Sequence, residues 1–120
     1  RKRPPKKPLK AVELPPDVKA FIADYSQARL SNDVVTMSNL ISDRFLYNGV
    51  TKHMALRFLK TILSYTSEAK IIITNFEPEG DEVKIDVLLK DKYFEVPFMI
   101  DSKLIKEDGQ WKWYGNQISN

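Results

Sequence analysis

A few side chains of this sequence could move a proton. His53 is the lone histidine and can act as a base near pH 7. Asp43 could orient such a base, and Asp86 could point into a cavity if its strand face is interior. A simpler interpretation leaves His53 and Asp86 solvated. His53 lies in the first turn of an expected helix, whose N-terminus disfavours an imidazolium. Asp86 alternates with the apolar Ile85 and Val87 along its strand. No pair of acids with complementary environments can be identified, so these residues do not by themselves establish catalysis.

A second group of side chains is suited to contact with an apolar molecule. The ring of Tyr25 fits a core and its hydroxyl the rim of that core. Trp111 and Trp113 share one face of an expected strand, which is typical of a core stripe, a pocket wall or a dimer face. Methionine and aromatic side chains adapt to apolar ligands. The predicted lining of an apolar pocket is Tyr25, Tyr47, Met54, Phe58, Met99 and Trp113.

The composition excludes several kinds of site. With no cysteine there is no disulfide framework, thiolate zinc site or nucleophilic thiol, and one histidine cannot build a histidine-based metal cluster. Phosphate loops, metalloprotease helices, serine elbows and dinucleotide fingerprints are absent from the sequence. We therefore expect no metal and no cofactor.

Charge is concentrated at the N-terminus. The first ten residues hold six of the 19 Lys and Arg and no acid, so the other 110 residues carry 13 basic and 16 acidic groups. This arm is interpreted as a solvated spacer, with a membrane surface as the alternative contact. It has no aromatic residue for base stacking, so a nucleic-acid partner is not expected. A basic, proline-rich start without Met is typical of a processed chain, which favours an extracytoplasmic (periplasmic or secreted) origin.

The sequence divides into a linker at residues 1–16 and a domain at 17–120. Four of the seven prolines lie in the linker, which predicts an extended, disordered segment. Asp17 is expected to cap a first helix, and Asn32 with Asp33 to end it and cap a short second one. Gly49 allows a turn after a short strand, and an apolar stripe running from Ala55 to Thr66 predicts a third helix that begins near residue 51 or 52.

From Ala69 onward the composition becomes β-branched and aromatic. It predicts strands near 70–77, 82–90, 93–106 and 110–118, joined by turns short enough to make neighbours antiparallel. The alternation in the third of these strands fails after Ile100, which indicates a bulge or bend near Asp101 to Lys103. Pro97 lacks a ladder donor and favours an edge or a bulge.

This order of elements over about residues 17 to 118 resembles the nuclear transport factor 2-like superfamily, including its polyketide-cyclase-like (SnoaL-like) and ketosteroid-isomerase-like branches. The residues that carry the resemblance are ARLSNDVVTMSNLISDRFLYNG, the step from Gly49 to Leu59, and the final DGQWKW. The resemblance implies an α+β fold, cystatin-like, in which a curved antiparallel sheet wraps around a long helix as a cone. It also implies a small apolar molecule at the open end and a homodimer through the outer sheet face.

The same resemblance implies roles for two residues. Tyr25 looks like the counterpart of the tyrosine that hydrogen-bonds the substrate oxygen in the ketosteroid-isomerase branch. The carboxylate base of that branch falls at about Asn48, and an amide cannot accept a proton at neutral pH. We therefore expect a non-catalytic ligand-binding or protein-interaction domain. Two alternatives stay open: a cofactor-free isomerase, dehydratase or cyclase in which Tyr25 acts with Asp43, His53 or Asp86, and an extracytoplasmic assembly component anchored at its N-terminus.

Overall fold

The structure of the chain, a computed structural model, describes residues 12–58 and 68–119. It opens with helix α1 (Pro16–Leu30), one residue before the predicted domain boundary. Pro16 stands where its fixed φ suits a first turn. Buried side chains recur along α1 at spacings of three and four, so one face of the helix is apolar. Residues 1–11 of the predicted linker lie outside the described residues.

The start of α1 differs from the prediction. The N-cap position is Pro15, and Asp17 lies inside the first turn. The Asp17 carboxylate instead accepts a hydrogen bond from Trp111 Nε1 at 2.8 Å, which ties the helix to the last strand. Just before the helix, Val12 donates its N–H to the carbonyl of Ile73 at 3.1 Å, so the end of the predicted linker lies against the sheet.

Helix α2 (Val34–Asn39) begins as predicted. Asn32 takes a left-handed φ of 57° after α1, and the Asp33 side chain caps α2. The Asp33 carboxylate accepts from the Thr36 N–H at 3.1 Å and from the Thr36 hydroxyl at 2.6 Å. Both acceptor atoms therefore serve the first turn, which is the usual role of aspartate at this position.

A small hairpin follows α2. Strands β1 (Leu46–Tyr47) and β2 (Val50–Thr51) are antiparallel. Asn48 and Gly49 join them with φ of 48° and 85°, the two left-handed residues that a tight two-residue turn requires. A helical segment then covers 52–58, as predicted for its start. Its predicted continuation to residue 66 lies outside the described residues.

The main sheet has four antiparallel strands in the order β3-β4-β5-β6. They are β3 (Lys70–Glu79), β4 (Glu82–Lys90), β5 (Glu95–Glu107) and β6 (Gln110–Trp113). Strand β6 ends five residues before the predicted position 118, because the chain leaves the sheet and runs along β1. There Leu46 N–H donates to the Tyr114 carbonyl, and Gln117 N–H donates to the Leu46 carbonyl.

Bulges bend the central strands. Between the pairs Ile85↔Ser102 and Val87↔Met99, β5 holds one residue more than β4. Asp101 takes a φ of 52° there, at the start of the predicted range for a bulge. The Asp86 carboxylate accepts from the Asp101 N–H at 2.8 Å and so fixes the bulge. Strong local twist follows from such an insertion.

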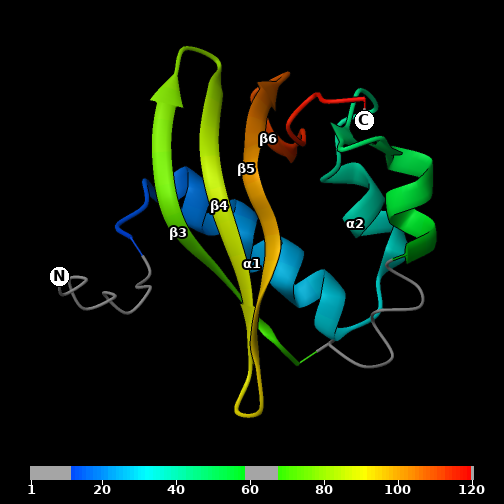
Figure 1. Cartoon of the computed structure of the whole chain (residues 1–120), viewed down its shortest axis with the longest axis vertical. Coiled ribbons are helices and arrows are strands. Elements are labelled where there is room, and N and C mark those ends of the chain that lie inside the picture. Colours follow the sequence, from blue (N-terminus) through cyan, green and yellow to red (C-terminus); the bar gives the residue numbers. More distant parts are fainter. Residues whose placement is uncertain (1–11, 59–67, 120) are drawn as a thin grey trace, which may run out of the picture.

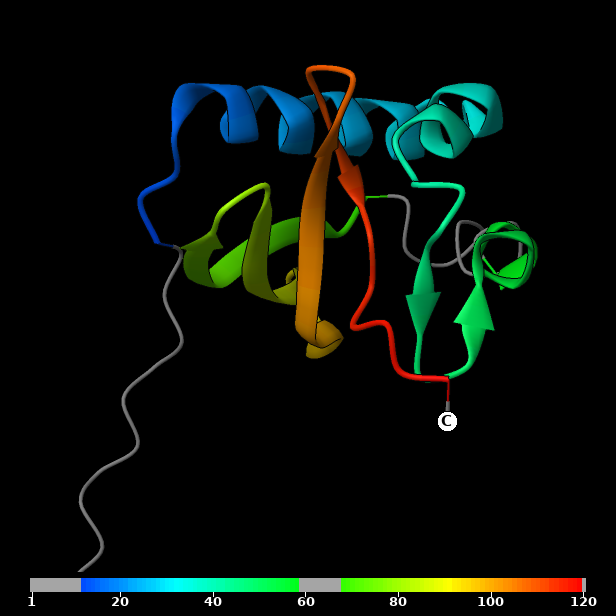
Figure 2. The same cartoon turned by 90° about the horizontal axis from the view of Figure 1, so that it is seen from above.

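The curved sheet packs one face against α1 and is not closed (Figures 1 and 2). Trp113 lies at the centre of this contact, with ring centroids 5.1 Å from Phe21 and 5.3 Å from Tyr25. The Trp113 side chain is buried, whereas Trp111 on the same face is half-buried. Trp113 is therefore a core residue, and the fold is α+β as predicted.

Within the ranges 12–58 and 68–119, no helix has the length and hydropathy of a membrane span.

A candidate ligand pocket

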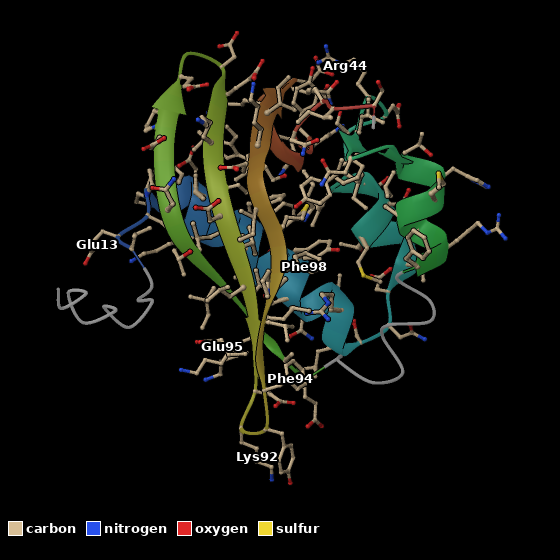
Figure 3. The ribbon with its side chains drawn as sticks, viewed as in Figure 1. Glu13, Arg44, Lys92, Phe94, Glu95 and Phe98 are labelled. Atoms are coloured by element: carbon tan, nitrogen blue, oxygen red, sulfur yellow. The ribbon has the colours of Figure 1, made fainter. Side chains whose placement is uncertain are left out.

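An apolar pocket of about 180 Å³ lies between the α1-backed sheet and the β1–β2 hairpin with its following helical segment. In Figure 2 this hairpin and helix stand beside β5 and β6 rather than over the sheet. Figure 3 shows Phe98 on β5 facing this side of the molecule. The described residues that line the pocket are Tyr25, Ile41, Phe45, Tyr47, Val50, Ala55, Phe58, Phe98, Met99 and Trp113.

The polar side-chain groups in this lining are two tyrosine hydroxyls and the indole N–H of Trp113. The Tyr47 hydroxyl accepts from the Ile100 N–H at 2.9 Å and donates to the Ile100 carbonyl at 3.1 Å, so its hydrogen-bonding capacity is used by the protein. Among the residues that the structure describes, no hydrogen bond engages the hydroxyl of Tyr25, and the buried Nε1 of Trp113 has no partner either. Tyr25 therefore retains a donor for a bound molecule.

Burial sets the protonation state of Tyr25. The side chain is 2% exposed, and this burial raises the pKa of the phenol above its ordinary value, partly offset by the positive charge of Arg29. The hydroxyl therefore keeps its proton at neutral pH and can donate a hydrogen bond, but it cannot serve as a base.

A buried arginine stands behind the pocket wall. Arg29 lies one turn after Tyr25 on α1, and its guanidinium carbon is 5.9 Å from the ring centroid of Phe98. Its Nη1 donates to the Ala69 carbonyl at 3.4 Å. Burial lowers the pKa of the guanidinium, and the nearby Tyr25 raises it. Arg29 is not a lining residue, so it supports the wall from behind.

The other predicted proton-transfer residues lie away from the pocket. Asp43 has a side chain 94% exposed and forms an ion pair with Lys52 at 2.8 Å, and the hydrogen bond from Lys52 lowers the pKa of its carboxyl. His53 is exposed on the helical segment. Asp86 is held by the backbone of Asp101. None of the three lines the pocket with Tyr25.

The predicted ligand-binding residues are brought together with one exception. Tyr25, Tyr47, Phe58, Met99 and Trp113 all line the pocket. Met54 does not line it and is 40% exposed. Sequence reasoning missed Ile41, Phe45, Val50, Ala55 and Phe98. The run RFLYNGV held a signal for Phe45 and Val50, because their neighbour Tyr47 was already assigned to the pocket.

The position that the family resemblance aligned with a catalytic carboxylate has a different role here. Asn48 lies in the hairpin turn and is not among the lining residues. Its side-chain carbonyl accepts from Asn116 Nδ2 at 2.8 Å, and its N–H donates to Asn116 Oδ1 at 3.1 Å. This reciprocal pair fixes the hairpin against the C-terminal segment.

Comparison with known proteins identifies the fold alone. No family model matches the sequence, and no curated protein matches it. Among solved structures, an NTF-2 like protein of unknown function from Silicibacter pomeroyi aligns with 12% identity and a TM-score of 0.59, covering 82% of this chain and 88% of that one.

Two further structures agree. A protein of unknown function with a cystatin-like fold from Nostoc punctiforme has 11% identity and a TM-score of 0.56, covering 82% of this chain and 84% of that one. A putative calcium/calmodulin dependent protein kinase II association domain from Xanthomonas campestris has 15% identity and a TM-score of 0.60, covering 88% and 89%. The helix-backed curved sheet and these alignments establish that the chain adopts the fold of the nuclear transport factor 2-like superfamily, as its sequence predicted.

Proposed function

We propose that the domain binds a small apolar molecule carrying one acceptor oxygen and does not convert it. The observation that carries this proposal is the pairing of an apolar lining with one tyrosine hydroxyl, that of Tyr25, left over for a ligand. An apolar pocket with few oriented polar groups is the usual form of a small-molecule site.

The volume restricts the size of the ligand. A dry apolar cavity of roughly 150 Å³ holds a benzene molecule. A pocket of about 180 Å³ therefore suits a single ring with a short substituent. A carbonyl or ether oxygen on that substituent would accept the hydrogen bond from Tyr25, whereas a charged group would lose its hydration without gaining an oppositely charged partner in the described lining.

The absence of a positioned base supports binding rather than turnover. Proton transfer needs a base within hydrogen-bond reach of the substrate, directly or through one water. Asp43, His53 and Asp86 all lie outside the described lining, and Tyr25 is held in its protonated form. Among the described residues, the isomerase alternative therefore has its polarising group but lacks the base.

A ketone and a hydrocarbon of the same shape test the proposal. Acetophenone and ethylbenzene are titrated into the protein, with the fluorescence of Trp113, 5.3 Å from the Tyr25 ring, as one readout and calorimetry as another. Tyr25→Phe removes only the hydroxyl. We expect this variant to bind acetophenone about 5- to 10-fold more weakly, as the loss of one hydrogen bond predicts, and to bind ethylbenzene unchanged.

Met54→Ala is the matched control, because Met54 is apolar and near the pocket in sequence but does not line it. It should leave both affinities unchanged. Failure of either compound to bind the wild-type protein, or equal effects of Tyr25→Phe on both, would reject the assigned ligand contact. Deuterium uptake at the acetophenone methyl, followed by NMR in D₂O, would instead support the isomerase alternative.

We also propose that the outer face of the sheet supports a homodimer. Ile72, Leu88 and Pro97 stand in register across β3, β4 and β5, and Ile72 lies between two residues that point into the core. Leu88 is 4% exposed, whereas Ile72 is half-buried and Pro97 is exposed. An apolar row on the outer face of a sheet favours a second copy, and one solved structure of the same fold is named an association domain.

Sedimentation velocity of the purified chain tests the dimer. We expect wild-type protein to sediment as a dimer and Ile72→Glu as a monomer, because a carboxylate in the row would be desolvated without a partner. Lys19→Glu, on exposed α1, is the control and should remain dimeric. Monomeric wild-type protein would contradict this second proposal and leave the ligand proposal standing.

A further inference from the structure

The turn between β1 and β2 holds Asn48 and Gly49, the one place in the sequence where glycine follows asparagine. Asparagine in this setting can lose its side-chain amide, because glycine has no Cβ to shield its backbone nitrogen. We propose that Asn48 is a site of spontaneous deamidation, that residues 116–118, here called the clasp, keep it unreacted, and that its conversion releases one wall of the pocket. This inference does not depend on what the pocket binds.

The reaction needs only the chain and water. The Gly49 nitrogen, after losing its proton to a solvent base, attacks the side-chain carbonyl carbon of Asn48, and the side-chain nitrogen leaves as ammonia. The resulting five-membered imide adds water at either carbonyl, which gives aspartate or isoaspartate. In total, water is consumed and ammonia is released. The attack therefore requires that the Gly49 N–H is free and that the Asn48 side chain can rotate onto it.

The clasp engages the attacking nitrogen. Gly49 N–H donates to the carbonyl of Ile118 at 2.8 Å. A hydrogen bond of this kind favours the protonated form of the donor and points the nitrogen at its acceptor. In Figure 2 the C-terminal segment, in red, ends beside the turn. The nucleophile is thus occupied in the folded chain.

The clasp also holds the amide that would be attacked. Asn116 donates through Nδ2 to Asn48 Oδ1 at 2.8 Å, and its Oδ1 accepts from the Asn48 N–H at 3.1 Å. Because both bonds go to one amide, Asn48 Oδ1 is held on the side of its own N–H, whereas the Gly49 nitrogen lies beyond the Cα. The bond to Oδ1 must break before the Asn48 side chain can rotate onto Gly49.

Asn116 is itself fixed in place. Its Oδ1 also accepts from the Ile118 N–H at 3.0 Å, and the next residue, Gln117, donates its N–H to the Leu46 carbonyl at 2.8 Å. Asn48 remains exposed, so water and solvent bases reach it in the folded state. Its protection therefore comes from hydrogen bonds rather than from burial, and it ends when the clasp moves away from the turn.

Conversion of Asn48 would act on the pocket through the hairpin. Tyr47 and Val50 pair with each other across the turn, and both line the pocket. Isoaspartate adds a backbone atom to a two-residue turn, whose φ values of 48° and 85° set the register of that pair. Aspartate keeps the backbone and an acceptor for Asn116. We therefore expect isoaspartate to release the hairpin and aspartate to leave it in place.

Peptide mapping by mass spectrometry tests the inference on the full chain, incubated at neutral pH below the melting temperature. The measured quantity is the rate at which the Asn48 amide becomes a carboxyl, with isoaspartate separated from aspartate by chromatography. A free peptide of sequence FLYNGVTK gives the rate without the clasp. We expect the folded chain to react at least roughly a hundredfold more slowly than the peptide, as three hydrogen bonds of ordinary strength predict.

Asn116→Ala removes two of these bonds and should accelerate deamidation of Asn48 by roughly 10- to 30-fold. Ile118→Ala is the matched control. It shortens an exposed side chain of the clasp but keeps the carbonyl that binds Gly49, so it should react as wild type does. Asp33→Ala removes the cap of α2 and lowers stability without touching the clasp, and it should also leave the rate unchanged.

Hydrogen exchange tests the effect on the pocket. The Val50 amide should exchange faster in the isoaspartate fraction of aged protein than in fresh protein. Asn48→Asp produces the other product directly and should exchange at the rate of fresh protein, because its backbone is unchanged.

Four results would overturn the inference. A folded chain that reacts as fast as the peptide, or an unchanged rate in Asn116→Ala, would show that the clasp gives no protection. Equal acceleration by Asn116→Ala and Asp33→Ala would assign the reaction to global unfolding. Unchanged exchange of Val50 in the isoaspartate fraction would show that the modification leaves the pocket wall in place.

Discussion

The Tyr47 hydroxyl makes two hydrogen bonds to one residue, Ile100, accepting from its N–H at 2.9 Å and donating to its carbonyl at 3.1 Å. Among the described residues, strand β5 pairs with β6 only from Leu104 to Glu107. At Ile100, the side chain of Tyr47 therefore takes the hydrogen bonds that a neighbouring strand would otherwise make. The same tyrosine lines the pocket. One residue therefore fastens the small hairpin to the main sheet and shapes the cavity between them.

Tyr47→Phe should weaken this connection while keeping the ring. Loss of both bonds is expected to lower the free energy of unfolding by about 1–2 kcal/mol, because water can reach Ile100 and replaces them in part. Urea denaturation measures the change. Tyr93→Phe is the matched control, since that ring is 81% exposed, and should stay within about 0.5 kcal/mol of wild type. Equal effects of the two variants would show that the pair of hydrogen bonds to Ile100 contributes nothing to the free energy of unfolding.

Gly115 permits the C-terminal segment to lie against β1. Its φ is +80°, and an added Cβ would overlap the backbone carbonyl of Leu46. Gly115→Ala should therefore cost more than about 2 kcal/mol of unfolding free energy, measured in urea. At Gly109 the φ is similar, +78°, but an added Cβ meets nothing within 4 Å. Gly109→Ala should cost only roughly 1 kcal/mol, so the difference between the two variants isolates the close approach.

Glu107 makes stability depend on acid pH. Its carboxylate accepts from Arg44 Nη2 at 2.7 Å and from the buried Ser42 hydroxyl at 3.0 Å. The bond from Arg44 chiefly holds the pKa of Glu107 below its ordinary value of 4.5. A lowered pKa in the folded state means that the contribution is complete above 4.5 and is lost as the pH falls through the folded value.

The stability difference between wild type and Glu107→Gln should therefore be largest near neutral pH and shrink below about pH 4.5. Urea unfolding at a series of pH values measures it. Glu77→Gln, on an exposed part of β3, is the control. A difference that stays constant down to acid pH would mean that ionisation of Glu107 is not the source of the effect.

Asp86 is predicted to position a bulge rather than to transfer protons. Asp86→Asn keeps an acceptor for the Asp101 N–H, whereas Asp86→Val removes it. We expect the Asn variant to match wild-type stability and the Val variant to lose about 1 kcal/mol. Hydrogen exchange of the Asp101 amide gives a direct readout and should accelerate only in the Val variant. Faster exchange in both would show that the carboxylate charge itself is required.

Local patterns predicted most elements because their signals span only a few residues. Asp33 caps α2 through Thr36, three positions away, and the turn before the third helix follows from Gly49. The prediction failed at Asp17, where the acceptor is used by Trp111, 94 residues later in the chain. A helix-start residue has the same local signal whether it caps the helix or bonds a distant strand, so sequence spacing cannot separate the two.

The pocket residues also divide into those that the sequence predicted and those that only tertiary contacts determine. Five of its lining residues follow from residue type, since aromatic and sulfur-containing side chains are suited to apolar cavities. Met54 was misplaced because the rotation of the short helical segment turns Ala55 and Phe58 toward the cavity. Phe98 was missed because a register shift between Val87 and Leu88 changes which residues of β5 face inward. One inserted residue reverses the alternation of inward- and outward-facing side chains from which the strand faces were predicted.

By itself, the sequence determined the order and type of the helices and strands, the antiparallel pairing of neighbouring strands and the absence of cysteine chemistry. Periodicity, caps and turn residues act over a few positions and survive without tertiary contacts. Only the tertiary structure decided that Tyr25 has a hydroxyl to spare while Tyr47 does not, and that Asp43, His53 and Asp86 stand apart from the pocket. These outcomes depend on bulges and on contacts between distant segments, which fix where a side chain points after the chain has folded.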